Sequence, residues 1–419
     1  MSKHVIRLYG KLPNTNVEID ININGKTLII TGVNGSGKTY FLQQMYIALT
    51  NSFNTHNSAR IEALRKAISE TEALILSDPV YYSKGQHHFE MLKEHKSHLK
   101  AFQHDLIYEL SEPGTLYKKY INKSAIVSIF DAGRTAKIDA ADGAKGIDSE
   151  KEQFSSSMPE AKVGSKLEQH LVNLRNRMSL AITEDGDIAL SESIKNWFAH
   201  FENQLKLIME DHQATLKFNT STLSFTIMRP GKPPTSFQTL SSGHSAIFDI
   251  YSELLMRTQY FEITPDALTG VVFIDEIEAH LHVSLQRTIL PFFKRSFPKI
   301  QFIVTTHSPF VLTSTDDTTI FDLANNEQIE KDISLYSYSS VMEGLLGTKP
   351  TSIILDDTIA EISEASTNQS VDINRLNALL LKVKSSYNEL DTASKASYLF
   401  GLNVLQDEVQ ANVPSKTSD

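Results

Sequence analysis

Runs of consecutive apolar residues mark the strands that this chain is expected to bury. Each run is short and typical of a strand covered on both faces of a parallel sheet. Residues 5–9 and 16–21 show partial two-residue alternation instead, punctuated by Gly10 and Pro13, which predicts a small antiparallel sheet before the first buried strand. The apolar runs are residues 27–31, 125–130, 271–274 and 300–306. Together the two patterns predict an α/β fold.

Helical periodicity fills much of the sequence between the first two runs. Two segments separated by Asp78 and Pro79 carry apolar side chains at heptad spacing, which predicts a helical hairpin. This hairpin is much shorter than the arms of long-armed tethering proteins. Its seam residues are Ile61, Leu64, Ile68 and Ile75 in the first helix and Leu92, Leu99, Phe102 and Leu106 in the second.

The rest of the chain alternates polar segments with helices and two short strands. Residues 139–166 are rich in glycine, serine, lysine and glutamate, and they are predicted to form a mobile loop. Helices are expected over residues 167–211 and 245–257, with short strands near 215–218 and 223–228. Amphipathic helices, suited to docking or oligomerisation rather than catalysis, are predicted from Ile373, Leu376, Leu379, Leu380, Val383 and Tyr387.

The composition narrows the available chemistry. The 419 residues are 41% hydrophobic and 21% charged, which are values of a globular protein with a large core. Cysteine is absent, which excludes a disulfide framework, a thiolate zinc site and a cysteine nucleophile, and fits a reducing compartment. Residues 1–4 lack the apolar core of a signal peptide, and no window is apolar enough to span a bilayer. We therefore expect a cytoplasmic protein without a membrane partner.

The charge distribution leaves two interpretations of the hairpin open. A formal net charge of -10 argues against a surface that is basic throughout, so nucleic acid would need a local patch. Lysines gather in and after the second hairpin helix, with acidic residues interspersed. Both a DNA-facing patch and an ordinary solvated helix face fit this pattern. His95 and His98 could share a helix face as metal ligands, although no third ligand has suitable spacing.

Residues 32–39 carry the pattern Gly-x-x-x-x-Gly-Lys-Thr between a predicted strand and a helix predicted at residues 40–50. That context identifies a phosphate-binding loop. The glycines let successive backbone N–H groups face one anion, beside the positive end of the helix dipole. Lys38 adds a charge for the outer phosphates, and the Thr39 hydroxyl suits Mg²⁺. The expected nucleotide-binding residues are Asn34, Gly35, Ser36, Gly37, Lys38, Thr39 and Tyr40.

A second candidate anion-binding segment precedes the helix expected at residues 245–257. Ser241, Ser242 and Gly243 combine hydroxyl groups, a missing Cβ and the free N–H groups of a helix start. On its own such a segment is more often a simple helix cap. Whether residues 241–243 bind an anion or only cap the helix therefore depends on the other motifs with which they occur.

Two further polar positions follow buried strands. Asp275 and Glu276 end the run at residues 271–274, where carboxylates lie at the ligand-binding edge of an α/β sheet. We expect Asp275 to hold Mg²⁺ from its outer shell and Glu276 to orient and partly deprotonate an attacking water. His307 ends the run at residues 300–306. A strand-end histidine is usually structural, but in this order it suits sensing of a γ-phosphate.

In this order the four motifs resemble the nucleotide-binding heads of ABC-type ATPases, and among these the RecF, SMC and OLD-like group. The runs at residues 274–282 and 305–309 are typical of OLD-like ATPases. Residues 240–244 resemble the signature motif of these ATPases, although His244 stands where that motif usually has Gln or Glu. The resemblance implies a homodimer or higher oligomer with two ATP molecules sandwiched between two heads. Each ATP would be held by one chain's phosphate loop and by residues 241–243 of the other. ATP and Mg²⁺ are the implied cofactors.

The C-terminal region departs from OLD proteins, which continue into a Toprim nuclease. Glu343 is not followed by the Asp-x-Asp that such a nuclease needs. A head without its own nuclease resembles the ATPase subunits of two-gene bacterial anti-phage systems of the PARIS and Septu types. This implies an ATPase whose head closure senses phage or DNA and controls a separately encoded nuclease or effector, with DNA or a phage protein as a further partner. The alternatives are a RecF-like DNA repair or replication ATPase and, less favoured by the motifs, a transporter ATPase subunit.

The expected fold class is an α/β P-loop NTPase head of the ABC type. It would carry an N-terminal antiparallel β subdomain, an inserted helical hairpin and a C-terminal helical region. The expected segments are residues 1–55 with the phosphate loop, 56–124 with the hairpin, 125–235 with a strand, the mobile loop and a helical lobe, 236–330 with the signature, the acidic strand end and His307, and 331–419 with the docking helices.

Overall fold

The computed structural model describes two compact units, Met1–Val341 and Met342–Asp419. They are called the N-terminal unit and the C-terminal unit below. Within them, the described residues are 4–15, 17–53, 63–64, 66–73, 75, 88–96, 106–156, 161–329, 332–349, 351–367 and 372–411.

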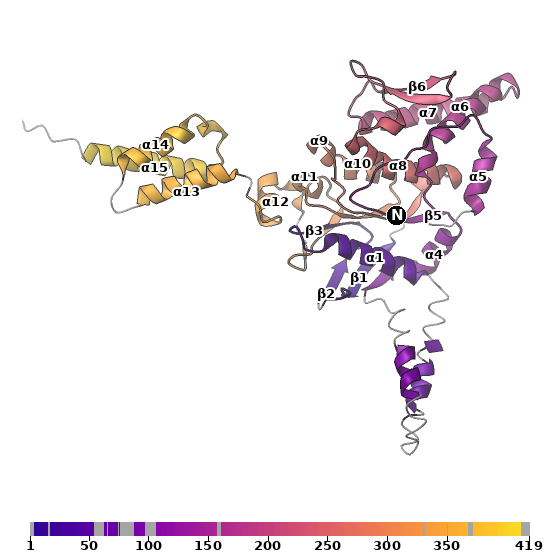
Figure 1. Ribbon diagram of the computed structural model, residues 1–419, viewed down its shortest axis with the longest axis horizontal. Coiled ribbons are helices and arrows are strands. Elements are labelled where there is room, and N and C mark those ends of the chain that lie inside the picture. Colours follow the sequence, from indigo (N-terminus) through magenta and orange to yellow (C-terminus); the bar gives the residue numbers. More distant parts are fainter. Residues whose placement is uncertain are drawn as a thin grey trace, which may run out of the picture. The chain divides into compact units, whose positions relative to one another are not determined.

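A six-stranded sheet forms the centre of the N-terminal unit (Figure 1). Its strand order is β11-β10-β3-β9-β8-β5, and all neighbours pair in parallel except β10 and β11. Every residue of β3, β8 and β9 is buried, which confirms the strands predicted from the apolar runs. The parallel strands also bring their carboxyl ends to one edge. The strands are β3 (Thr27–Thr31), β5 (Ala125–Phe130), β8 (Thr269–Ile274), β9 (Ile300–Thr305), β10 (Thr318–Asp322) and β11 (Glu327–Ile329).

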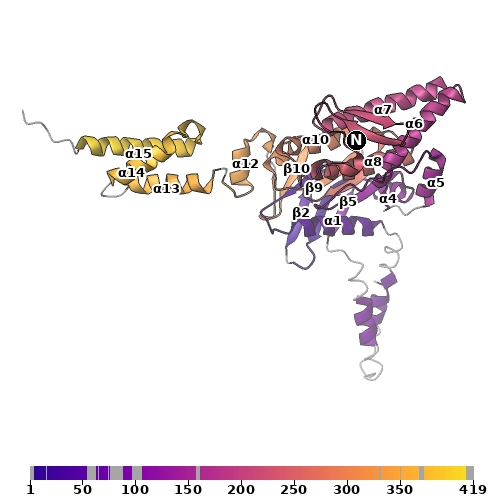
Figure 2. The ribbon, with the colours of Figure 1, turned by 45° about the horizontal axis from the view of Figure 1, so that its top comes forward.

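A helical lobe follows β5 in the chain (Figure 2). The predicted helices and short strands in this region are confirmed. Helix α8 begins slightly earlier than predicted, because Ser241 is its N-cap residue. The elements are α6 (Leu167–Thr183), α7 (Ile188–Ile208), β6 (Thr215–Asn219), β7 (Ser224–Met228) and α8 (Ser242–Tyr260).

The mobile loop predicted over residues 139–166 is corrected by the structure. Helix α5 (Ile147–Ser156) and the 3-10 helix η1 (Gly164–Lys166) both lie within it. Side chains of α6 also hold its backbone: Gln169 accepts the N–H of Asp142 at 3.1 Å, and Asn173 accepts the N–H of Lys145 at 2.7 Å. Because the partners in these bonds are backbone groups, the polar composition of the segment gave no sign of them.

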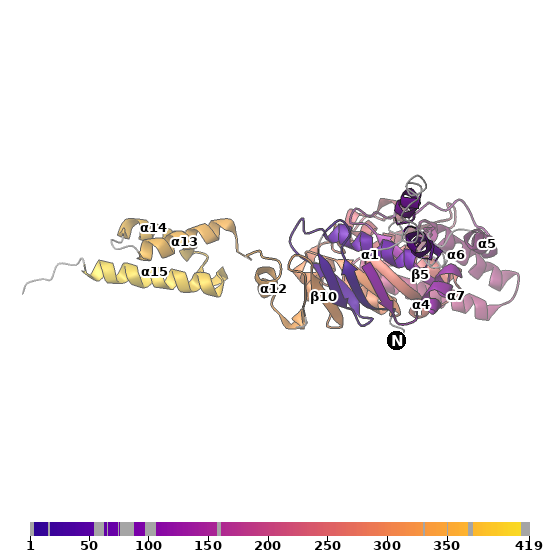
Figure 3. The ribbon, with the colours of Figure 1, turned by 90° about the horizontal axis from the view of Figure 1, so that it is seen from below.

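A three-stranded antiparallel sheet, in the order β2-β1-β4, belongs to the same unit (Figure 3). Strands β1 (Val5–Lys11) and β2 (Glu18–Asn22) confirm the small antiparallel sheet predicted from alternation. Leu106, predicted to close the second hairpin helix, instead begins β4 (Leu106–Leu110), which pairs with β1. Helix α4 (Pro113–Ile121) follows, so the last part of the expected hairpin segment packs with the head.

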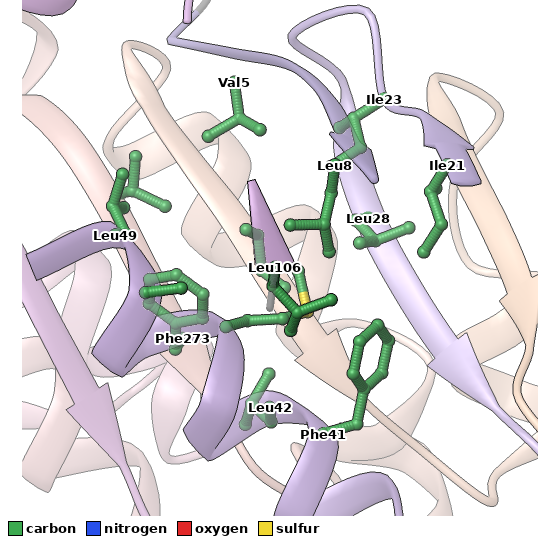
Figure 4. Close-up of a cluster of buried hydrophobic side chains, with 14 of the residues drawn as sticks. Val5, Leu8, Ile21, Ile23, Leu28, Phe41, Leu42, Leu49, Leu106 and Phe273 are labelled. Carbon is green, nitrogen blue, oxygen red and sulfur yellow. The ribbon is translucent and has the colours of Figure 1, made fainter. Parts of the chain in front are cut away.

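One hydrophobic core of this unit joins the antiparallel sheet, α1 (Lys38–Ser52) and the main sheet. Figure 4 shows Leu8 and Leu106 from the sheet beside Phe41 and Leu42 from the helix. Each of these side chains is at most 3% exposed, and burial of one such side chain contributes about 1.5–3 kcal/mol. Helix α1 is therefore firmly held, and so is the phosphate loop that precedes it.

The remaining hairpin residues are described only in part. Residues 66–73 and 88–96 are helical, whereas Ile61, Leu99 and Phe102 lie outside the described residues. Lys96 of the second segment pairs with Glu72 of the first at 2.7 Å, and both side chains are about half exposed. His98 also lies outside the described residues. Among the residues that the structure describes, no group of three or more histidine, cysteine, aspartate or glutamate side chains could hold a metal ion.

The C-terminal unit has a hydrophobic core of its own. Its helices are α13 (Ile353–Thr367), α14 (Ile373–Lys384) and α15 (Thr392–Ala411). Helix α14 confirms the helix predicted from Ile373 to Val383, whereas Tyr387 lies in a separate 3-10 helix. Gly401 permits a close approach of α15, because a Cβ there would lie 2.8 Å from Cγ2 of Ile362. The core residues are Ile362, Ala365, Leu376, Leu380, Val383, Leu390 and Tyr398.

Short helices complete the described fold. None of the helices in the described ranges has both the length and the apolar stretch needed to cross a membrane. The short elements are α9 (Val283–Gln286), α10 (Ile289–Ser296), α11 (Pro309–Leu312) and α12 (Tyr338–Gly344), with the 3-10 helices η2 (Phe237–Thr239), η3 (Pro265–Ala267), η4 (Ile333–Leu335) and η5 (Tyr387–Glu389).

Candidate functional site

The glycine-rich loop joins β3 to α1 at the carboxyl edge of the main sheet. Gly32, Gly35 and Gly37 have φ angles of 141°, 81° and 89°, in the region that favours glycine. Gly37 is the N-cap residue of α1 and leaves the first N–H groups of the helix without a side-chain cap. The loop therefore ends in free donors and a positive helix terminus, as an anion site requires.

Lys38 is buried within this loop. Its Nζ donates hydrogen bonds to the carbonyl oxygens of Gly32 at 3.0 Å and Val33 at 3.2 Å. Burial lowers the pKa of Lys38, and the nearby negative charges of Glu276 and Glu278 oppose that shift. The ammonium group therefore lies within electrostatic reach of the carboxylates that follow β8.

Thr39 and Asp275 make direct contact across the edge of the sheet. The Thr39 hydroxyl donates to Oδ2 of Asp275 at 2.8 Å. Thr305, at the end of β9, donates to the other carboxylate oxygen at 2.6 Å and accepts the backbone N–H of Glu276 at 2.7 Å. The Asp275 side chain is thus held by one residue of the phosphate loop and one of the neighbouring strand.

Glu276 continues the chain in an unusual backbone conformation. Its φ angle is 41°, in the left-handed region that a non-glycine residue enters only at a cost. The side chain is half-buried, and its charge acts on both Lys38 and His307. After this turn the carboxylate therefore lies within electrostatic range of Lys38 and His307.

His307 lies in the same electrostatic environment. Burial lowers its pKa, the positive charge of Lys38 lowers it further, and Glu276 and Asp275 act in the opposite direction. Its backbone N–H donates to Glu278 at 2.5 Å. The neutral imidazole is therefore favoured near neutral pH, as a hydrogen-bond donor or acceptor rather than a fixed charge.

Several polar residues that support this site were given no role by the sequence pattern. Thr305 and Glu278 bridge the ends of β8 and β9, as described above. Arg134, 6% exposed, donates to backbone carbonyl oxygens of the turn after β8. Asp322, at the end of β10, accepts the backbone N–H of Ala324 beside Gly32. Glu278 and Thr305 lie within the runs typical of OLD-like ATPases, whereas Arg134 and Asp322 lie outside every predicted motif.

The second anion-binding segment has different neighbours within the chain. Ser241 hydrogen-bonds Nδ1 of His244 at 2.8 Å, and a Cβ on Gly243 would lie 2.8 Å from the carbonyl oxygen of His280. Burial lowers the pKa of His244, and the charge of Arg229 lowers it further. Residues 241–244 therefore interact with a set of groups other than those around Lys38. Ser242 is exposed at the first turn of α8.

The donor atoms around Thr39 fit a hard cation. They comprise a hydroxyl oxygen and a carboxylate oxygen in contact, which are ligand types that Mg²⁺ prefers. Mg²⁺ at nucleotide sites is usually held by one or two such groups, by phosphates and by water, rather than by an all-protein cage. Ser36 adds a buried hydroxyl with no hydrogen-bond partner among the described residues, which is available to a phosphate oxygen.

Comparison with known families gives one broad match. A family model described as "AAA domain, putative AbiEii toxin, Type IV TA system" matches residues 28–313. The match begins in β3 and ends just beyond His307, so it includes the phosphate loop, residues 241–243, Asp275, Glu276 and His307. It covers more than half of the chain.

Comparison with curated proteins gives shorter matches. The "Retron Ec83 probable ATPase" of Escherichia coli is 30% identical over 166 residues, which cover 33% of this chain and 31% of that protein. The "Septu protein PtuA" of Bacillus mycoides (strain KBAB4) is 36% identical over 128 residues, which cover 30% of this chain and 18% of that protein. The chain therefore spans about a third or less of the length of these relatives. The resemblance to Septu-type ATPase subunits is confirmed.

Among solved structures, an SMC head bound to the C-winged helix domain of ScpA is 13% identical, with a TM-score of 0.37. The alignment covers 76% of this chain and 93% of that structure.

Proposed function

The chain belongs to the AAA-domain family matched over residues 28–313, and from that premise we propose that it binds ATP with Mg²⁺ and hydrolyses it. The observation that carries this proposal is the 2.8 Å hydrogen bond from Thr39 to Asp275. It joins the phosphate loop to the acidic end of β8, two segments far apart in sequence. A hydroxyl and a carboxylate in contact beside a buried lysine are what Mg²⁺-dependent phosphoryl transfer needs.

We assign the roles from this geometry. Lys38 and the loop N–H groups bind the phosphates, and Thr39 and Asp275 would hold Mg²⁺, which neutralises charge on the phosphate oxygens when bound. Glu276 orients a water molecule and accepts its proton. His307 donates a hydrogen bond to the γ-phosphate, a role that its neutral form permits. The loop residues from Asn34 to Tyr40 complete the nucleotide contacts.

A second copy of the chain would complete the site. Ser241, Ser242 and Gly243 lie at the N-terminus of α8, where free N–H groups and hydroxyls suit an anion. Within one chain they have other neighbours than Lys38, so we propose that they contact ATP bound to the partner copy. The closed dimer would then form only around ATP, and hydrolysis would release it.

We further propose that this cycle controls a separately encoded nuclease or effector in anti-phage defence, with DNA or a phage protein as the trigger. Two relatives with the names Septu protein PtuA and retron ATPase support this biological setting. The alternative, a RecF-like DNA ATPase, depends on the hairpin lysines. Lys96 is paired with Glu72, which is ordinary for a solvated face, so we favour the first role.

The test is ATP binding and hydrolysis by purified protein in Mg²⁺. Glu276→Gln is expected to keep ATP affinity and lower kcat by about 10²- to 10⁴-fold, the range for loss of a general base. It is also expected to accumulate as the ATP-bound dimer, from which affinity isolation should recover a nuclease subunit. Lys38→Ala should lose ATP and dimer together. Unimpaired hydrolysis by Glu276→Gln would overturn the assignment of the base, and no ATP binding by the unmodified chain would overturn the function.

A further inference from the structure

A buried arginine outside the predicted motifs holds the turn that carries Glu276. The guanidinium of Arg134 donates to the carbonyl oxygens of Asp275 at 2.7 Å, Ile277 at 2.8 Å and Glu276 at 3.2 Å. It also donates to the carbonyl oxygen of Asp131, in its own segment, at 3.1 Å. One side chain therefore donates to three consecutive carbonyl groups after β8, of which that of Glu276 also accepts the backbone N–H of Ala279 at 2.7 Å.

The shape of the turn explains why an arginine is needed. With φ at 41°, Glu276 turns the chain out of the extended strand conformation, and the carbonyl oxygens of residues 275–277 all accept from the same guanidinium. Buried carbonyl groups without donors are costly. The planar guanidinium offers several donors at fixed angles, whereas the ammonium of lysine is a single point of contact.

The charge of Arg134 is also compensated where it lies. Burial lowers the pKa of Arg134, and the negative charges of Asp249, Glu278 and Asp275 act in the opposite direction. Asp249 belongs to α8, so the negative groups around the guanidinium come from both α8 and the turn after β8. Arg134 lies between these two elements.

The same segment binds the start of α8 directly. The backbone N–H of Ala136 donates to Oγ of Ser245 at 2.9 Å and approaches the carbonyl oxygen of Ser245 at 3.3 Å. Ser245 closes the first turn of the helix, because its N–H donates to the carbonyl oxygen of Ser241 at 2.8 Å. Only Thr135 therefore separates Arg134, whose guanidinium holds the Glu276 turn, from Ala136, which binds the first turn of α8.

The start of α8 also contacts the turn after β8 directly, through Gly243 and His280. Gly243 packs so closely on the carbonyl of His280 that a Cβ would lie 2.8 Å from that oxygen. His280 is the second non-glycine residue of this turn with positive φ, at 65°. The turn after β8 (residues 275–282) and the turn at the start of α8 (residues 241–245), called the signature turn, thus touch through Gly243. They are joined again through Arg134 and Ala136.

We propose that Arg134 is a positioning residue that fixes the Glu276 turn relative to the signature turn at the start of α8. The inference rests on the proposed function, because it gives the two turns their roles. Arg134 touches no nucleotide in this scheme. It sets where Glu276 stands in its own site and where Ser241–Gly243 stand for the site of the second copy, so a change at one site reaches the other through this contact.

The first test is kinetic and uses Arg134→Lys in the full chain. ATP affinity measured by direct binding should stay within about threefold, since Lys38 and Thr39 are untouched. The kcat should fall about ten- to hundredfold, the equivalent of losing hydrogen bonds to a charged donor. Arg257→Lys is the matched control: Arg257 is also buried, and it pairs with Glu253 and donates to the carbonyl oxygen of Ala161 instead. It should lower Tm but leave kcat within about threefold.

The second test does not depend on catalysis and uses hydrogen–deuterium exchange. In Arg134→Lys, amides of residues 275–282 and of residues 241–246 should both exchange about tenfold faster or more, and in Arg257→Lys neither segment should change. Faster exchange in the first segment alone, or in neither, overturns the inference. An unmodified chain without ATPase activity would overturn the proposed function, and the exchange result would still decide the role of Arg134.

Discussion

The Oε1 atom of Glu278 accepts the backbone N–H of His307 at 2.5 Å. Glu278 follows β8 and His307 follows β9, so the bond fixes the ends of two neighbouring strands relative to each other. Burial raises the pKa of this carboxyl group, and the hydrogen bond from His307 and the nearby hydroxyl of Thr306 oppose that shift. A buried polar group in this state is costly, which indicates that the position is kept for the site rather than for stability.

Glu278→Ala should therefore impair the site through His307. The change leaves a buried N–H without an acceptor, at a cost of about 1–3 kcal/mol, and releases the end of β9. We expect kcat to fall about tenfold with ATP affinity little changed. Glu278→Gln keeps an acceptor oxygen of the same shape and should retain most of the activity. Equal loss in both variants would show that the charge matters more than the bond to His307.

Thr39 gives a prediction about Mg²⁺. Thr39→Val keeps the shape of the side chain but removes the hydroxyl that contacts Asp275. We expect the Mg²⁺ concentration for half-maximal ATP hydrolysis to rise about ten- to hundredfold, the range for lost groups around a metal. Thr39→Ser keeps the hydroxyl and should stay near the unmodified chain. A Mg²⁺ titration in which valine and serine behave alike would contradict the role of the hydroxyl.

A substitution at Gly243 tests the role of residues 241–243 separately from that of the phosphate loop. Alanine there places a Cβ 2.8 Å from the carbonyl oxygen of His280, and this crowding costs about 1–3 kcal/mol. Gly243→Ala should retain ATP binding to its own phosphate loop but lose ATP-dependent dimerisation, measured by light scattering. The control is Gly114→Ala in α4, where a Cβ would meet nothing within 4 Å. Dimerisation that persists in Gly243→Ala would count against the signature role.

His4 predicts a pH dependence of stability. Its Nε2 hydrogen-bonds Oγ1 of Thr269 at 2.7 Å, and burial, assisted by the charge of Lys119, lowers its pKa from 6.5 to about 4. The unfolded chain therefore takes up this proton first, so the contribution to stability is complete above pH 6.5 and is lost as the pH falls toward about 4. The loss should reach about 2–3 kcal/mol.

Urea unfolding between pH 4 and pH 7 measures this effect. His4→Gln keeps a hydrogen-bonding group without a proton to gain, so its stability should depend less on pH across that window. The difference between the two curves isolates His4 from the other histidines of the chain. Parallel curves for the two proteins would contradict the assignment.

Much of the fold could be predicted because burial leaves a direct trace in the sequence. Strands β3, β5, β8 and β9 are covered on both faces, so they appear as continuous apolar runs. The phosphate loop has fixed glycine and lysine spacing, and its place between strand and helix confirmed the motif. That Asp275 would lie beside the phosphate loop followed from the rule that parallel strands share one ligand-binding edge, and the direct bond from Thr39 is a finding of the structure.

Other features left no such trace. Strand β4 pairs with β1, which lies far away along the chain, and the alternation of its five residues was too short to separate from a helical repeat. Arg134 binds backbone carbonyl groups, which every residue possesses, so no pattern of side chains points to it. The role of Glu278 depends on how β9 lies beside β8. These features depend on tertiary packing and could not be derived from local spacing.

The left-handed backbone at Glu276 also limits how this protein can change by mutation. A non-glycine residue pays roughly 1–2 kcal/mol for that conformation, which glycine would recover. Selection for thermal robustness alone would therefore favour glycine at this position, and selection for turnover would oppose it. If Glu276 acts as proposed, directed evolution for higher Tm should be screened for activity in every round, because the simplest stabilising substitution at this turn would remove the base.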